Sequence, residues 1–136
     1  YWVGKKIRNL VNGKIIGGHP GLTPEYRGVH SPFWAIFNKE PDKIGYTVFW
    51  VDSGVDTGDI IFQDTIQPEE NDSYISLSWK CMKKISEATR DALLDYQNKG
   101  IEIPRKKIDA VPENSLYYHP TIFQYLKYRF MQRQVR

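Results

Sequence analysis

Apolar residues in the first third of the chain occur in short runs, separated by loops rich in glycine and proline. Residues 1–13 predict a short helix or turn that ends at an Asn-Gly pair, and residues 14–16 predict a short buried strand. Residues 17–28, GGHPGLTPEYRG, cannot form a helix, because two prolines fix φ and lack a backbone donor. Residues 31–38 begin with Ser-Pro, a typical helix start, and carry apolar side chains for packing.

Two strands are expected in the middle of the chain. Residues 45–52, GYTVFWVD, and residues 59–66, DIIFQDTI, are rich in β-branched and aromatic residues, which favour strands. Residues 53–58 connect them in the manner of a hairpin. With the flanking helices, these strands predict an α/β or α+β fold, of which we take α/β as the prediction. In an open α/β sheet, the loops at the carboxyl ends of neighbouring strands converge on one crevice.

A long amphipathic helix is expected over residues 72–99, where the spacing of apolar residues changes. Asp72 or Ser73 can cap its start, and Gly100 suits its C-terminal cap. We interpret Cys81 and Met82 as core or near-core residues rather than as ligands. Apolar residues that recur every three to four positions define the expected buried face: Trp79, Met82, Ile85, Ala92, Leu93 and Tyr96.

Residues 101–136 form a basic, tyrosine-rich extension, which we separate from a core domain of residues 1–100. From Lys99 to Arg136 there are 8 basic and 3 acidic residues. A basic segment can contact RNA, a membrane surface or a protein partner. Because no RNA-binding motif accompanies the charge, a solvated helix face is the simpler interpretation, and nucleic acid is not an expected partner.

A last helix is expected to begin at Pro120, with Ile122, Leu126 and Phe130 on one face. Residues 101–108 before it predict a short extended segment interrupted by proline. Tyrosines crowd this region, and aromatic rings interleaved with arginine could stack on bases. Packing of the tyrosines on the domain, or on a second subunit, is the commoner cause of such a cluster.

The overall composition bounds the class of protein. With 136 residues, 40% hydrophobic and 26% charged, the chain has the size and composition of one globular domain. Its apolar runs are too short for a transmembrane helix, and no signal peptide opens it. Cys81 is the only cysteine, which excludes an internal disulfide and favours a reducing, cytoplasmic compartment. The chain begins with Tyr1 rather than Met, which suggests processing or a piece of a longer protein.

Candidate chemistry lies in two loops that each follow an expected strand. His19 stands in the first loop, and Asp52, Asp56 and Asp59 stand in the second, VDSGVDTGD. If the loops meet, one carboxylate can orient His19, which can then move a proton or stabilise an oxyanion. The aspartates could equally form turns. Their spacing does not match a calcium loop, so no metal is expected, and no serine or cysteine stands in a nucleophile-elbow context.

Two motifs resemble the folate-dependent formyltransferase family: HPGLTPEYRG at residues 19–28 and GYTVFWVDSGVDTGDIIFQ at residues 45–63. This family includes glycinamide ribonucleotide, methionyl-tRNA and sugar N-formyltransferases and formyltetrahydrofolate hydrolase. The resemblance covers residues 14–66 and extends to the helix of residues 73–99. It implies a truncated, Rossmann-like sheet with flanking helices and a C-terminal helical tail. It also implies transfer of a formyl group from 10-formyltetrahydrofolate to an amine-bearing small molecule.

The resemblance implies roles for individual residues. His19 would stabilise the oxyanion that forms as the amine attacks the formyl carbon. Asp56 would orient His19 and relay protons through a water. The backbone of the same loop would lie against the pterin, which makes Val51, Asp52, Val55 and Asp56 the expected folate-binding residues.

Two departures from the family pattern suggest an alternative to an active formyltransferase. Gly17 stands where the family has an asparagine, and loss of one oxyanion donor typically costs roughly 3–4 kcal/mol. Only a short segment precedes the histidine motif, whereas the family's catalytic domain begins with βαβ elements. We therefore expect an open sheet edge and an apolar face that a partner or second copy would cover. The alternative is a catalytically impaired fragment that acts as an oligomeric or interaction module.

Overall fold

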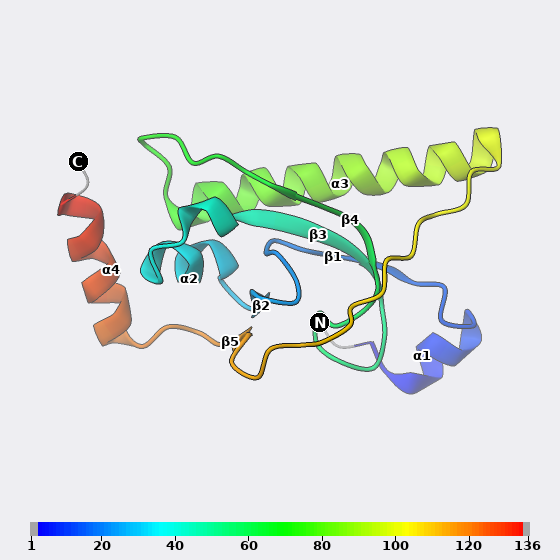
Figure 1. Ribbon diagram of the computed structural model, residues 1–136, viewed down its shortest axis with the longest axis horizontal. Coiled ribbons are helices and arrows are strands. Elements are labelled where there is room, and N and C mark those ends of the chain that lie inside the picture. The colour runs from blue at the N-terminus through cyan, green and yellow to red at the C-terminus, as the bar shows by residue number, and fades with distance from the viewer. Residues whose placement is uncertain (1–2, 135–136) are drawn as a thin grey trace.

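The computed structural model describes residues 3–134, in which one long helix lies along a three-stranded sheet (Figure 1). The sheet has the order β1-β3-β4, and both neighbouring pairs are antiparallel. Its strands are β1 (Ile16–His19), β3 (Gly45–Trp50) and β4 (Ile60–Thr65). The two strands expected in the middle of the chain are therefore confirmed, each within two residues of its expected ends.

β1 differs from the expected strand at residues 14–16, because pairing with β3 continues through two glycines to His19. Close packing explains this extension. A Cβ at Gly18 would lie 2.2 Å from the Ile85 side chain, and a Cβ at Gly17 would lie 2.9 Å from the Val51 side chain. Side chains alternate along a strand, so Gly17 and His19 face away from the long helix while Gly18 faces it. His19 thus ends a strand and does not stand in a loop.

The long helix α3 (Tyr74–Lys99) begins and ends where the sequence predicts, but its buried face is different. Ser73 is the N-cap, its hydroxyl accepting from the Ser76 amide, and Gly100 is the C-cap with φ 66°. The buried residues of α3 are Leu77, Cys81 and Ile85. Trp79 is 71% exposed and Met82 43% exposed, and Leu93 and Tyr96 are also exposed. The buried positions recur every four residues, because the narrow sheet covers only that stripe of α3. Of the six residues expected on the buried face, Ile85 is buried and Ala92 is half-buried, and the other four are exposed.

Cys81 behaves as a core residue, as expected. Its side chain is fully buried, and its thiol donates to the Gly45 carbonyl at 3.2 Å. Burial raises the pKa of Cys81 to about 12, so the thiol is inert near neutral pH.

A second group of elements packs at one end of the sheet. It contains β2 (Arg27–Gly28), α2 (Ser31–Phe37), the 3-10 helix η1 (Pro41–Lys43) and β5 (Leu116–Tyr117), while α1 (Lys5–Leu10) lies at the opposite end (Figure 1). β2 and β5 pair in parallel, and the Tyr117 ring stacks on Tyr26 at 5.2 Å. The C-terminal segment therefore crosses back to pack on the first half of the chain.

The last helix, α4 (Ile122–Gln134), turns its expected packing face outward. Ile122, Leu126 and Phe130 are all more than half exposed, whereas Tyr128 is 1% exposed and packs against Phe33. The hydroxyl of Tyr128 accepts from the Tyr74 amide at 3.3 Å, so a ring with a polar tip occupies the buried position. Across residues 3–134, no helix is both long and apolar enough to span a membrane.

Candidate active site

His19 is 4% exposed, and both of its ring nitrogens have neighbours. Nε2 lies 2.7 Å from the Tyr26 carbonyl oxygen and 3.0 Å from the Ser31 hydroxyl. Because a carbonyl can only accept, Nε2 carries a proton and donates it to Tyr26. Nδ1 points the other way, and its neighbour is Asp56 Oδ2 at 3.4 Å. Nδ1 is therefore the nitrogen that can exchange a proton beside the carboxylate.

Asp56 reaches His19 by a route that differs from the one expected. The two loops do not leave the same edge of the sheet, because β1 and β3 are antiparallel and their carboxyl ends lie at opposite ends. The loop after β3 instead folds back toward β2. There the Gly28 amide donates to Asp56 Oδ2 at 2.9 Å. Asp56 has φ 52°, a left-handed conformation that aspartate tolerates better than most residues.

The Arg27 side chain holds the loop that carries Asp56 by a bond to the backbone of that loop. Its Nη1 donates to the Val55 carbonyl at 3.1 Å, and its Nε donates to the Ser115 hydroxyl at 3.0 Å. In the structure the guanidinium joins the first loop, the second loop and the C-terminal segment. This side chain, together with Gly28, holds Asp56 beside His19.

The other two aspartates of the loop bind other partners and do not contact His19. Asp52 Oδ1 accepts from the Gly54 amide at 2.9 Å and from the Thr57 hydroxyl at 2.8 Å, which makes it a turn residue. Asp59 Oδ2 accepts from Arg105 Nη1 at 3.0 Å. Of the three candidate carboxylates, Asp56 is thus the one in contact with His19.

Burial governs the protonation of His19. Desolvation lowers its pKa, against the opposing effects of the Asp56 carboxylate and the Tyr26 carbonyl, which raise it. The resting imidazole is therefore neutral near pH 7, with its proton on Nε2 and a lone pair on Nδ1. Such a group can accept a proton at Nδ1 and then present an N–H beside Asp56.

Two polar residues beside His19 were not predicted from the sequence. Ser31 looked like a helix-start residue, but its buried hydroxyl contacts both His19 Nε2 and the Tyr26 carbonyl, each at 3.0 Å. Thr47, opposite His19 on β3, donates to the Gly21 carbonyl at 2.7 Å and accepts from Gln63 at 2.9 Å. Backbone acceptors and buried hydroxyls leave no sequence pattern that could have revealed them.

A hollow of about 570 Å³ lies between α1 and the beginning of the second loop. It is lined by Arg8, Asn9, Asn12, Gly13, Val51, Asp52 and Ser53. Val55, further along the loop, is 44% exposed. The expected folate-binding residues thus lie on an accessible loop that borders a cavity. Within residues 3–134, no three His, Cys, Asp or Glu side chains gather as metal ligands would.

Comparison with protein families gives a match that covers most of this core. The formyl transferase family, described as "Formyl transferase", matches residues 3–93. A methionyl-tRNA formyltransferase of Caldicellulosiruptor saccharolyticus is 36% identical over 106 residues, which are 78% of this chain and 32% of that protein. A GDP-perosamine N-formyltransferase of Brucella melitensis is 42% identical over 78 residues, 52% of this chain and 30% of that protein. The chain thus spans about a third of the length of these relatives.

Solved structures show the same fold. The formyltransferase PseJ of Anoxybacillus kamchatkensis, solved with tetrahydrofolate and a formamido sugar nucleotide, has a TM-score of 0.67 at 22% identity, over 96% of this chain and 64% of that one. A 4-N formyltransferase of Francisella tularensis has a TM-score of 0.63 at 31% identity, over 88% and 46% of the two chains. Because the family match extends over more than half of the residues and the fold agrees, the chain belongs to the formyl transferase family.

Proposed function

We propose that this chain contributes the proton-handling residues for transfer of a formyl group from 10-formyltetrahydrofolate to an amine. The observation that carries the proposal is the contact of His19 Nδ1 with Asp56 Oδ2 at 3.4 Å, with Nε2 committed to the Tyr26 carbonyl. Membership of the formyl transferase family supports it.

The chemistry follows from which atoms can move a proton. An attacking amine must lose one proton, and the nitrogen that leaves the formyl carbon must gain one. His19 Nδ1, neutral at rest, takes up the first proton directly or through Asp56. The resulting Nδ1–H then donates to the developing oxyanion, and the same proton passes to the leaving nitrogen. His19 and Asp56 end in the state in which they began.

The folate would lie along the second loop. When bound, it supplies the activated formyl group. Val51 and Asp52 border the hollow beside α1, and Val55 and Asp56 follow on the same loop, so a flat ring can contact the backbone between Val51 and Asp56. Tetrahydrofolate and folinic acid are present in the structures of related formyltransferases, which supports a folate-type ligand.

The acceptor is an amine carried by a larger molecule. The relatives act, by name, on methionyl-tRNA, GDP-perosamine and phosphoribosylglycinamide. We propose an amine of this kind for the present chain, with sugar nucleotides as the first acceptors to test. The 42% identity to a GDP-perosamine N-formyltransferase over 78 residues supports this choice.

A second candidate function is an interaction module without catalysis. Gly17 favours it, because glycine places no amide beside His19 on the face that both residues share. The backbone there is also close to Val51 and Phe49, so their side chains occupy the space that a side chain at position 17 would need.

The experiment that separates the two functions is calorimetric titration of the folded chain with 5-formyltetrahydrofolate, followed by assay of tetrahydrofolate release from 10-formyltetrahydrofolate with the three acceptors. Binding and acceptor-dependent release that is lost in His19→Asn and kept in His119→Gln support the enzyme. A folded chain that binds no folate overturns it and favours the interaction module.

A further inference from the structure

The outer surface of α4 carries four large apolar side chains: Ile122, Phe123, Leu126 and Phe130. We call them the α4 stripe. Each is between 57% and 80% exposed, and their spacing places them along one side of the helix. Exposed apolar residues are ordinary when single, but a contiguous set of this size marks a contact surface.

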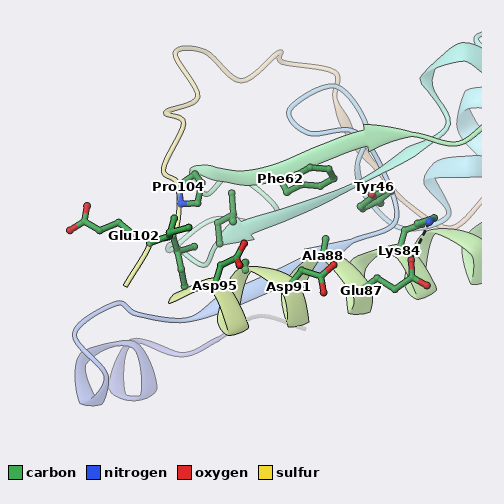
Figure 2. Close-up of a pocket in the computed structure, with 13 residues that line it drawn as sticks. Tyr46, Phe62, Lys84, Glu87, Ala88, Asp91, Asp95, Glu102 and Pro104 are labelled. Carbon is green, nitrogen blue, oxygen red and sulfur yellow. Dashed lines mark hydrogen bonds and ion pairs between the residues drawn. The ribbon is translucent and has the colours of Figure 1, made fainter. Parts of the chain in front are cut away.

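A complementary surface lies toward the other end of the molecule, beside the C-terminal half of α3 (Figure 1). A hollow of about 410 Å³ opens between α3 from Lys84 onward, the strands β3 and β4, and the segment after α3 (Figure 2). Phe62 and Ile101, each about half exposed, form apolar parts of its lining. Four carboxylates and a single lysine, Lys84, are the charged residues of its lining. We call this surface the acidic groove, and its carboxylates are Glu87, Asp91, Asp95 and Glu102.

Three of these carboxylates already have a cation on the same helix. Lys84 pairs with Glu87 at 3.1 Å, Arg90 with Asp91 at 2.7 Å, and Lys99 with Asp95 at 2.8 Å. Pairs between exposed side chains stabilise a protein by only about 0–1 kcal/mol each. These pairs can therefore be exchanged for contacts with a cation of another copy at little loss of stability.

We propose that the α4 stripe of one copy docks in the acidic groove of a second copy. By sequence, α4 contains three cations, Lys127, Arg129 and Arg133, and no acid. Two α4 helices placed face to face would bring like charges together, whereas the groove offers the opposite charge and an apolar floor. Lys127 lies over the Phe37 ring at 5.0 Å within its own chain, so Arg129 is the cation chosen for the test.

The contact is heterologous, because the helix of one copy meets the groove of another. It predicts that molecular mass rises with protein concentration. The mass also falls as salt is added, since screening weakens the contacts between the arginine and the carboxylates. The proposal does not depend on formyl transfer.

The test is sedimentation of the full chain over a hundredfold range of concentration. Phe130→Glu in the stripe and Asp91→Lys in the groove should each weaken association at least tenfold, while Glu70→Lys, an exposed acid outside both surfaces, should not. All three side chains are exposed, so we expect each variant to keep the fold, and thermal unfolding of each variant checks this.

One mixture and one double variant make the test specific. An equimolar mixture of the Phe130→Glu and Asp91→Lys variants should recover mixed complexes, since one supplies an intact groove and the other an intact stripe. Arg129→Glu combined with Asp91→Lys in one chain should associate more strongly than either change alone. A chain that stays monomeric throughout overturns the proposal. So does an Asp91→Lys variant that associates like the wild type, which would indicate a contact between α4 helices.

Discussion

The backbone amide of Gly28 donates to the same carboxylate oxygen of Asp56 that faces His19, at 2.9 Å. This bond crosses from β2 to the loop after β3 and fixes the oxygen that the imidazole meets. A charge-assisted bond of this kind is roughly twice as strong as a neutral one. The site is therefore held by a backbone donor as well as by side chains.

The variant Asp56→Asn should separate the charge of Asp56 from its geometry. Asparagine tolerates the left-handed φ of 52° and can still accept from Gly28, so we expect the fold to remain. Loss of proton relay should lower the transfer rate by about 10²–10⁴-fold. The assay is tetrahydrofolate release, with Asp59→Asn as the control. A rate equal to that of the wild type would remove Asp56 from the mechanism.

Arg27→Ala should loosen the second loop. The substitution removes bonds to the Val55 carbonyl and the Ser115 hydroxyl from a side chain at a buried position. Hydrogen bonds of charged groups contribute about 1.5–3 kcal/mol, so we expect a loss of that order in the free energy of unfolding. Urea denaturation measures it. Arg105→Ala, which removes an exposed pair with Asp59 and a contact with the Trp50 ring at 4.9 Å, is the control, with an expected loss of about 1 kcal/mol.

Gly21→Ala should displace His19. A Cβ at Gly21 would lie 2.5 Å from His19 Nε2, from the Ser31 hydroxyl and from the Tyr26 carbonyl, so one methyl group disturbs the whole cluster. Overpacking of this kind destabilises proteins by about 1–3 kcal/mol. Thermal unfolding and the NMR shifts of the His19 ring report both effects. Gly4→Ala, at a position with no atom within 4 Å of the added Cβ, should leave them unchanged.

Gly17→Asn tests whether Val51 limits the size of the side chain that position 17 can hold. The added Cβ would lie 2.9 Å from Val51 Cγ2, so we expect the single variant to lose about 1–3 kcal/mol of stability. Gly17→Asn combined with Val51→Ala should lose less than the sum of the two single changes. A double-mutant cycle by urea denaturation measures that coupling. Additive effects would show that Val51 does not limit the position.

Acid should destabilise the fold through His19 and His30, whose pKa values are both lowered in the folded chain. Burial lowers the pKa of His19, and burial and His119 lower that of His30. Because the unfolded chain binds these protons more readily, their contribution is complete above the unfolded histidine value of about 6.5. It is lost as pH falls through the lowered values. Urea midpoints should therefore decline from pH 7.5 to 5.5, and His19→Gln should flatten that decline. An unchanged slope in this variant would contradict the assignment.

Local sequence determined the long helix and the two central strands of this protein. The caps of α3 and the strands β3 and β4 depend on neighbours within a few residues, and so they agree with prediction. The chemistry-bearing residues were also visible, because histidine in a Gly/Pro-rich stretch and aspartates after a strand are local patterns. The family motifs in the sequence selected Asp56 from among the three aspartates.

The tertiary structure alone decided how these elements meet. The antiparallel direction of β1 and β3, the stripe of α3 that is buried and the outward face of α4 all depend on contacts between distant segments. Arg27 and Ser115, 88 residues apart, lock the loop that carries Asp56. The sequence shows where apolar side chains recur along a helix or strand. Which of them are buried, and which oxygen faces His19, depends on long-range packing and on backbone hydrogen bonds.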